Sequence, residues 1–307
     1  MKRVVGIVLL GLSGLACFAA GSWAERHWEL GARIGEHLPL IWRRPAVAPV
    51  IADEDLGHVE LYAFLGQSNA VGTAALPQAL ALQEQARVYV FGNDYRWRRR
   101  IEPLDDPRHQ VDLIAIDRQY GYSAATAFAR RIRQLRPQTP IGMLSCARGG
   151  SAISQWAPSH SDSTLYGACL KRVLAASASG RLAGIVFIQG ERDALDPGVA
   201  SKKVIHANDW AAQFAAMVAA ERSDFSRERL PVVLAKLGAP PRNPGRYSGW
   251  QTVKNQQDAV ALPCVASVAT DSFDKQADGM HYSVSGYDQL GSSLADAIDN
   301  LRRTGCL

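Results

Sequence analysis

The chain has 307 residues, of which 47% are hydrophobic and 21% are charged, and its formal net charge at pH 7 is +5. This composition provides enough apolar side chains for a large core and excludes an intrinsically disordered chain. The positive charge is modest and no nucleic-acid-binding motif accompanies it, so we expect no nucleic-acid partner.

Residues 1–24 differ from the rest of the chain. Lys2 and Arg3 precede residues 4–20, which carry no charge. As a helix this stretch falls a little short of the ~30 Å hydrocarbon core of a membrane, and extension to residue 24 closes the gap. Residues 22–24 (Ser-Trp-Ala) instead match the small-x-small cleavage site of a signal peptide. A cleaved signal peptide and an uncleaved N-terminal transmembrane helix both stay open. Either one engages the membrane or the export machinery and predicts a periplasmic or other extracytoplasmic location.

A linker is predicted over residues 25–57, and strand-like and helix-like segments alternate after it. This alternation indicates a mostly parallel sheet with helices on both faces, a three-layer α/β/α sandwich preceded by the N-terminal hydrophobic helix. We expect one domain over residues 58–307, because the polar motifs described next are spread along it and must converge. The predicted strands are 59–65, 87–91, 141–144, 185–188, 232–237 and 265–270, and the predicted helices are 123–135, 165–176, 210–221, 251–260 and 286–303.

Four polar motifs each follow a strand-like segment. Carboxyl ends of parallel strands meet at one edge of a sheet, so the motifs are predicted to form one site there. They are GQSN at residues 66–69, CARGGSAI at 146–153, QGERD at 189–193 and DGMH at 278–281.

The first and last motifs supply a serine, a histidine and a carboxylate. A serine hydroxyl is a weak nucleophile unless a neutral imidazole removes its proton, and a carboxylate then orients the imidazole. Asp278 and His281 are close enough in sequence to share one turn, which leaves the second ring nitrogen of His281 free to face Ser68. These residues predict a serine esterase.

The ordered set of motifs resembles the SGNH (GDSL-type) hydrolases, and within them the branch of sialate O-acetylesterases and carbohydrate esterase family six. The similarity runs from about residue 59 to the last predicted helix. It implies a flavodoxin-like α/β sandwich and cofactor-free removal of O-acetyl groups from a sugar or polysaccharide. It also implies that Ser68 is the nucleophile, His281 the base and Asp278 the acid.

For the oxyanion hole the resemblance implies the backbone amide of Ser68, that of Gly149 or Gly150, with Gly150 favoured, and the side chain of Gln189. The chain departs from the family at Ala70, where relatives often have methionine, and at residues 187–188, where an aromatic–histidine pair is frequent. Ala70 also excludes the nucleophile elbow of α/β-hydrolases, which requires glycine at that position.

Several side chains near the motifs have two interpretations. Trp156 either stacks on a sugar ring or packs in the core, and Arg148 either contacts substrate or pairs with a carboxylate. Glu191 and Asp193 are interpreted as holding the active-site loops by hydrogen bonds, in preference to binding a metal. The histidines lack ligand-like spacing, so no metal site is expected. The arginine cluster at residues 96–100 is either a solvated loop or a patch that attracts an acidic polysaccharide.

Four cysteines follow the N-terminal segment and allow three pairings in an oxidising compartment. Cys264 begins a strand that runs toward the catalytic edge, and the final helix runs back. This topology favours a bond between Cys264 and Cys306, and it leaves Cys146 and Cys169 either paired or as buried free thiols.

Three functions follow from this sequence. The leading one is hydrolysis of carbohydrate acetyl esters through an acyl-enzyme. The second is an exported acyltransferase that uses the same triad and passes acetyl to a cell-envelope polysaccharide. The third is a non-catalytic glycan-binding protein, which the presence of every triad and oxyanion residue disfavours.

Overall fold

The computed structural model describes residues 50–307, except 82–83, 113, 115–116, 118 and 200–206. The segment interpreted as a signal peptide or anchor, and most of the expected linker, therefore lie outside the described residues. Within the part of the chain that is described, no helix is both long and apolar enough to cross a membrane.

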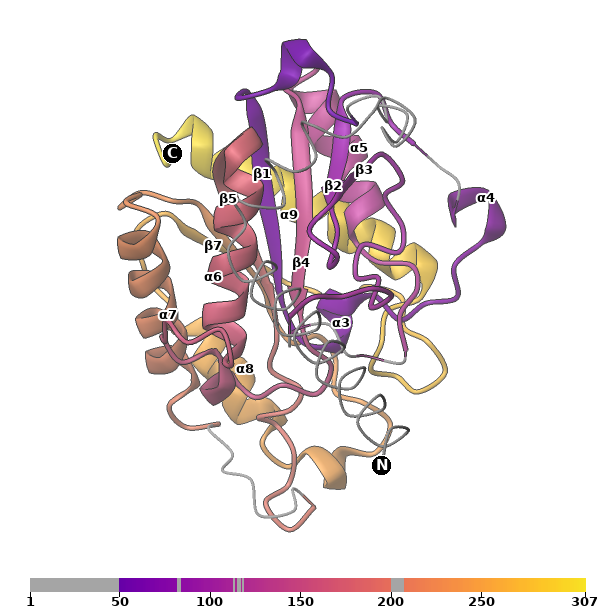
Figure 1. Cartoon of the computed structure of the whole chain (residues 1–307). Coiled ribbons are helices and arrows are strands. Elements are labelled where there is room, and N and C mark those ends of the chain that lie inside the picture. Colours follow the sequence, from indigo (N-terminus) through magenta and orange to yellow (C-terminus); the bar gives the residue numbers. More distant parts are fainter. Residues whose placement is uncertain (1–49, 82–83, 113, 115–116, 118, 200–206) are drawn as a thin grey trace, which may run out of the picture. The chain divides into compact units, whose positions relative to one another are not determined.

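The centre of the domain is a seven-stranded sheet with the strand order β3-β2-β4-β1-β5-β6-β7 (Figure 1). Every neighbouring pair is parallel except β2 and β3, which are antiparallel. The strands are β1 (Val59–Gly66), β2 (Val88–Phe91), β3 (Trp97–Arg98), β4 (Ile141–Ala147), β5 (Gly180–Ile188), β6 (Val232–Ala235) and β7 (Val265–Val268).

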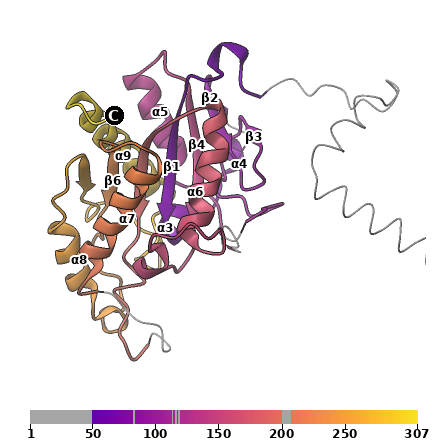
Figure 2. The ribbon, with the colours of Figure 1, turned by 60° about the vertical axis from the view of Figure 1, so that its left-hand side comes forward.

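Helices cover both faces of the sheet, as Figures 1 and 2 show from two sides. One face carries α5 (Ala125–Leu135) and α9 (Val284–Arg303). The other carries α6 (Leu165–Ala176), α7 (Trp210–Asp224) and α8 (Trp250–Asp258). The predicted three-layer α/β/α sandwich is confirmed. The shorter helices are α3 (Ser68–Val71), α4 (Gln78–Ala81) and the 3₁₀ turns Asp53–Asp55, Ile153–Trp156, Ser177–Ser179 and Pro244–Tyr247.

The central strand β1 shows why both faces must be covered. Successive side chains of a strand point to opposite faces, so a strand buried on both sides is apolar throughout. Leu61 and Leu65 lie in the core under α6 and α7. Tyr62 and Phe64 face the opposite way and pack edge-on against Phe128 of α5, with ring centroids 5.1 and 5.2 Å apart.

Residues 50–57, expected to be linker, are instead packed on the domain. The Ile51 side chain is buried in the core. Asp55 is also buried, and its carboxylate accepts hydrogen bonds from Tyr89 Oη at 2.7 Å and Arg87 Nε at 2.9 Å. The sequence of this segment did not predict these contacts, because the partners of Asp55 are remote in sequence: Tyr89 lies on β2 and Arg87 directly before it.

The predicted bond between Cys264 and Cys306 is confirmed, and Cys146 and Cys169 form a second disulfide. Cys264 lies just before β7, and α9 returns the chain to the same end of that strand. The bond closes a loop with a sequence separation of 42 residues.

Replacing both Cys264 and Cys306 by serine is expected to lower the free energy of unfolding by about 3–4 kcal/mol, because the unfolded chain regains the entropy of an open loop. Denaturant unfolding of the oxidised wild type and the double variant measures this difference. Peptide mapping of the non-reduced protein is the accompanying check, and two free thiols in oxidised material would contradict the assignment.

One buried carboxyl makes the stability of the fold depend on pH. Glu221 of α7 lies among apolar side chains that include Leu65 and Phe225, and no hydrogen-bond partner for its Oε2 exists among the described residues. Burial, assisted by the negative charge of Asp224, raises the pKa of Glu221 to about 8.

Because the folded-state pKa of Glu221 lies above the unfolded value, its neutral form stabilises the fold at low pH. This stabilisation is lost as pH rises from about 4.5 to about 8. The Glu221→Gln variant is therefore expected to be more stable than wild type at pH 8, on the order of 2 kcal/mol. Denaturant unfolding at pH 5 and pH 8 measures this, with the exposed Glu54→Gln change as control. An equal loss of stability between these pH values in both variants would show that Glu221 is not the responsible group.

Candidate active site

The turn after β1 places Ser68 at the carboxyl edge of the sheet. Gly66 has φ +130°, and a Cβ there would lie 2.0 Å from the carbonyl oxygen of Ile188 at the end of β5. Only glycine permits this approach. The chain then turns into α3, whose first residue is Ser68.

The loop before α9 brings Asp278 and His281 to the same point. His281 Nε2 lies 2.9 Å from Ser68 Oγ, and His281 Nδ1 lies 2.6 Å from Asp278 Oδ2. An ionised carboxylate accepts the Nδ1 proton, so Nε2 is left as the acceptor for the serine hydroxyl. The three residues that the sequence selected as a triad therefore form a continuous hydrogen-bonded chain.

Asp278 also orders the loop that carries the histidine. Its Oδ1 accepts the backbone N–H groups of Met280 and His281 at 2.8 and 3.0 Å. Partial burial acts to raise the pKa of Asp278, but these bonds and the one from the His281 ring outweigh it and hold the pKa below its usual value. Asp278 is therefore ionised at neutral pH.

Asn69 holds the serine turn and the histidine loop together. It is fully buried, and its Nδ2 donates to Glu191 Oε1 at 2.6 Å and to the carbonyl of Met280 at 3.3 Å. Its Oδ1 accepts the N–H of Tyr282 at 3.3 Å. Glu191 thus has the loop-holding contact that was predicted for it. No cluster of metal-ligating side chains occurs among the described residues.

The structure distinguishes the two glycines considered for the oxyanion hole. The Gly149 N–H donates to Asp117 Oδ2 at 2.8 Å and is therefore occupied. Gly150 has φ +67°, and no described residue accepts a hydrogen bond from its N–H. The N–H of Ser68 likewise has no acceptor in the described part of the chain. Ser68 and Gly150 are the amides available to a developing oxyanion.

Gln189 does not fit its predicted role as an oxyanion donor. Its side chain is buried, and Nε2 donates to Asp193 Oδ2 at 2.5 Å and to the carbonyl of Ser151 at 3.0 Å. Its Oε1 accepts the Trp210 indole N–H at 2.7 Å, which fixes the orientation of the amide. Both amide hydrogens are thereby used. Asp193 also accepts the Ile153 N–H at 2.9 Å, so this network ties β5 to the glycine-rich turn.

Gln67 is a polar residue of the site that sequence reasoning missed. Its Oε1 accepts the N–H of Arg192 at 3.1 Å, while its Nε2 has no acceptor among the described residues. The side-chain amide next to Ser68 therefore retains hydrogens that can be donated. The sequence signal that could have identified Gln67 as a site residue was its position inside the GQSN motif, directly before Ser68.

The structure places the two residues predicted to bind substrate, Trp156 and Arg148, in different surroundings. Trp156 is not a sugar-stacking residue: it is 1% exposed, packs edge-on against Phe187 and donates its indole N–H to Ser151 Oγ at 3.2 Å. Ile153 and Trp156 are the buried residues of the 3₁₀ turn Ile153–Trp156. Arg148 lines a separate cavity of about 540 Å³ beside Ser154, and its contact with substrate stays a prediction.

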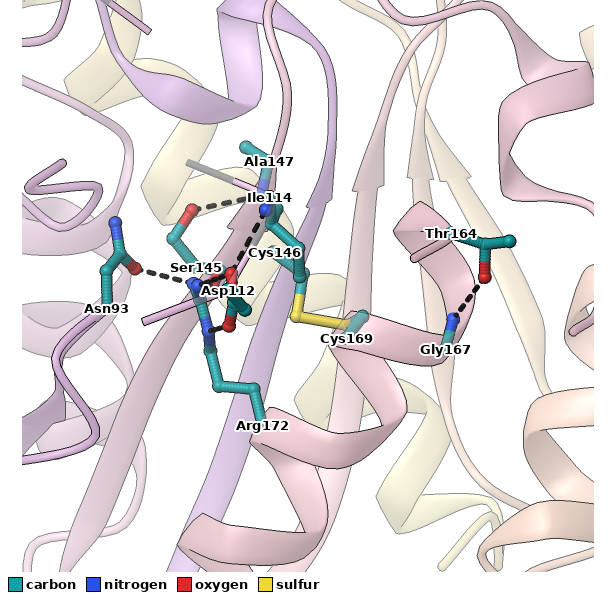
Figure 3. The surroundings of a disulfide bond; sticks show 10 residues. All are labelled: Asn93, Asp112, Ile114, Ser145, Cys146, Ala147, Thr164, Gly167, Cys169 and Arg172. Carbon is teal, nitrogen blue, oxygen red and sulfur yellow. Dashed lines mark hydrogen bonds and ion pairs between the residues drawn. A yellow bond between two sulfur atoms is a disulfide. The ribbon is translucent and has the colours of Figure 1, made fainter. Parts of the chain in front are cut away.

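Helix α6 holds the end of β4, the strand that leads into the glycine-rich turn (Figure 3). Arg172 is fully buried, and its guanidinium donates to the carbonyl of Ser145, to Asn93 Oδ1 at 2.5 Å and to Asp112 Oδ1 at 2.6 Å. The Cys146–Cys169 disulfide joins the same strand end to the same helix. The end of β4 is thus held by a covalent bond and by the hydrogen bond from Arg172 to the Ser145 carbonyl, immediately before the turn that carries Gly150.

A cavity of about 350 Å³ opens beside the triad, within the usual size range of ligand pockets. Its lining includes His281, Asp278, Tyr120 and Leu76. Tyr120 is 37% exposed, so its ring is available to a ligand. Tyr120 therefore has the exposed aromatic ring that Trp156 lacks.

A mostly parallel sheet covered on both faces, with serine, histidine and aspartate meeting at its carboxyl edge, is the architecture of the SGNH (GDSL-type) hydrolases. The family model described as carbohydrate esterase, sialic acid-specific acetylesterase, matches residues 58–300. The chain belongs to this family and is a carboxylic ester hydrolase.

Individual relatives agree with this assignment. A probable carbohydrate esterase of Arabidopsis thaliana is 28% identical over 209 residues, which are 66% of this chain and 71% of the relative. A solved Arabidopsis thaliana structure superposes with a TM-score of 0.65 at 23% identity, covering 78% of this chain and 98% of that one. A carbohydrate acetylesterase of Xanthomonas citri gives a TM-score of 0.59 at 21% identity, covering 81% of this chain and 57% of that one. These two structures share the fold.

Proposed function

We propose that this protein removes O-acetyl groups from a carbohydrate or polysaccharide through a covalent acetyl-enzyme. The observation that supports it most is the hydrogen-bonded chain Ser68–His281–Asp278, with 2.9 and 2.6 Å between successive side chains. This arrangement has the geometry required of a nucleophile, its base and an orienting carboxylate.

In the first half-reaction Ser68 Oγ attacks the acetyl carbonyl carbon while His281 Nε2 takes the hydroxyl proton. The tetrahedral intermediate collapses, the bond from the carbonyl carbon to the sugar oxygen breaks, and His281 returns the proton to that oxygen. Asp278 is ionised and stabilises the imidazolium that exists between these steps. The sugar leaves with a free hydroxyl group.

In the second half-reaction a water molecule attacks the acetyl-Ser68 ester. His281 now accepts the proton of water and passes it to Ser68 Oγ as acetate departs. The same groups serve both halves, and no step requires a cofactor.

The negative oxygen that forms in both half-reactions needs hydrogen-bond donors. We assign this role to the backbone amides of Ser68 and Gly150, and to Nε2 of Gln67 in place of Gln189. One donor of this type lowers the barrier by roughly 3 kcal/mol. Because Arg172 and the Cys146–Cys169 bond hold the end of β4, the Gly150 amide is positioned before substrate arrives.

Export from the cytoplasm is also part of the proposal. The two disulfides support it, because such bonds persist in oxidising compartments. The apolar residues 4–20 would supply the signal or anchor.

The acyl-chain preference tests the proposed substrate class. The cavity beside His281 is lined by short or polar side chains, including Thr73, Ala74 and Gln276, which suit an acetyl group on a sugar better than a long alkyl chain. We expect kcat/KM to fall about tenfold or more from acetyl to butyryl esters of one chromogenic alcohol. Acetylated sugars and polysaccharides are assayed in parallel for released acetate. A preference for octanoyl over acetyl esters would contradict the proposed carbohydrate substrate and favour a lipase-like substrate.

A further inference from the structure

The cavity beside the triad continues into a longer groove. It shares Leu76 and Tyr120 with a neighbouring cavity of about 520 Å³. That cavity shares Arg100 and Arg108 with a third one of about 270 Å³. The groove therefore leads from His281 past Tyr120 to a cluster of arginines.

Arginine dominates the far part of this groove. Arg98, Arg99, Arg100 and Arg108 line the third cavity, and the last three are exposed. Arg108 and Arg98 both pair with Asp106, at 2.6 and 3.5 Å. Among the described residues no acidic side chain forms an ion pair with Arg100, which lines both the second and the third cavity.

Two other carboxyl groups line the third cavity, Glu84 and Glu102. Glu102 is buried, and its oxygens accept hydrogen bonds from the hydroxyls of Ser123 and Thr126. Burial raises the pKa of Glu102 to about 7, so it carries less than a full negative charge near neutral pH. Glu84 is exposed but cannot balance the arginines alone, so the far part of the groove is positively charged.

We propose that this groove binds anionic groups, carboxylate or phosphate, of an acidic acetylated polysaccharide while a distant acetyl ester occupies the triad. Guanidinium groups donate paired hydrogen bonds that match both kinds of anion. The exposed Tyr120 ring lies between the charged part and His281, where it can pack against an intervening sugar. This inference rests on the proposed esterase function, and it adds that the substrate is charged and polymeric.

A charge series at Arg100 tests the inference in the full chain. The readout is the ratio of kcat/KM for an acidic acetylated polymer to kcat/KM for neutral acetylated xylan. We expect Arg100→Lys to retain this ratio, Arg100→Gln to lower it about threefold and Arg100→Glu to lower it about tenfold. The loss should lie in KM and shrink at high salt, because ions screen exposed charges. Glu84→Gln should change the ratio in the opposite direction, by about twofold.

The matched control is Arg130→Glu, which reverses an exposed charge on α5 outside these cavities and should leave the ratio unaltered. Separate acidic polymers bearing carboxylates and phosphates show which anion is preferred. Charge recognition by the groove is refuted if the Arg100 substitutions leave kcat/KM unaltered for both polymers. It is also refuted if they lower kcat/KM for the neutral polymer as much as for the acidic one.

Binding without turnover separates this inference from the proposed function. The Ser68→Ala chain is titrated calorimetrically with acidic and neutral polymers, with and without Arg100→Glu. If Arg100→Glu weakens binding of the acidic polymer but not of the neutral one, the proposed groove is supported even if wild type shows no esterase activity. The converse result is an active wild-type esterase together with a Ser68→Ala chain that binds both polymers equally, with or without Arg100→Glu. That result would refute anion binding by the groove and leave the proposed esterase function standing.

Discussion

Substitution of Ser68 by alanine is expected to reduce kcat for acetyl ester hydrolysis by about a thousandfold or more, with the fold retained. The change removes the oxygen that forms the acetyl-enzyme, and losses of triad members are typically of this size or larger. Ser68 is partly exposed at a turn, so the change removes no core packing. Stopped assays with a chromogenic acetate, at equal concentrations of folded protein, measure the loss.

The control for Ser68→Ala is Ser179→Ala. Ser179 lies in the 3₁₀ turn before β5, at the opposite edge of the sheet, and should tolerate the change without effect on kcat. Activity of the Ser68 variant above about a hundredth of wild type would contradict the nucleophile assignment. Mass spectrometry after a rapid quench should detect an acetyl group on wild-type protein at this serine.

Replacing Asp278 by asparagine is expected to lower kcat by roughly 10³–10⁴-fold, although the two side chains have nearly the same shape. The asparagine oxygen can still accept the N–H groups of Met280 and His281, so the loop keeps its conformation. Its NH₂ group would donate to His281 Nδ1 and would place the ring proton on Nε2. The imidazole then cannot accept the proton of Ser68. The measurement is kcat and KM with one acetyl ester over a range of pH.

The neighbouring change Asp271→Asn provides the control for Asp278→Asn. Asp271 is exposed and pairs with Lys254 away from the triad, so its replacement should leave kcat unaltered. Because hydrogen bonds keep the pKa of Asp278 low, the wild type should not lose its carboxylate charge within the neutral range. A mild effect of Asp278→Asn, confined to KM, would make Asp278 a substrate contact and not the partner of His281.

The sequence alone was sufficient to predict the layers of the fold, because a strand that is buried on both faces has apolar side chains along its whole length. The apolar runs that became β1, β4 and β5 are too continuous for a strand with a solvated face, and each ends in a polar motif. Parallel strands bring such ends together, which is why Ser68 and His281 could be placed in one site despite their separation. The same reasoning about strand direction predicted the bond between Cys264 and Cys306. Strand β3 was missed because two residues give no periodicity.

Tertiary contacts alone decided which polar groups of that site are available for chemistry. Asp117 occupies the Gly149 amide, and Asp193 and Trp210 use the hydrogen-bonding groups of Gln189. Asp117 and Trp210 lie on segments that local pattern cannot relate to the motifs they contact, whereas Asp193 belongs to the same motif as Gln189. Sequence identifies the types of groups that reach the edge of the sheet, whereas the hydrogen bonds formed after folding determine which N–H remains free for an oxyanion.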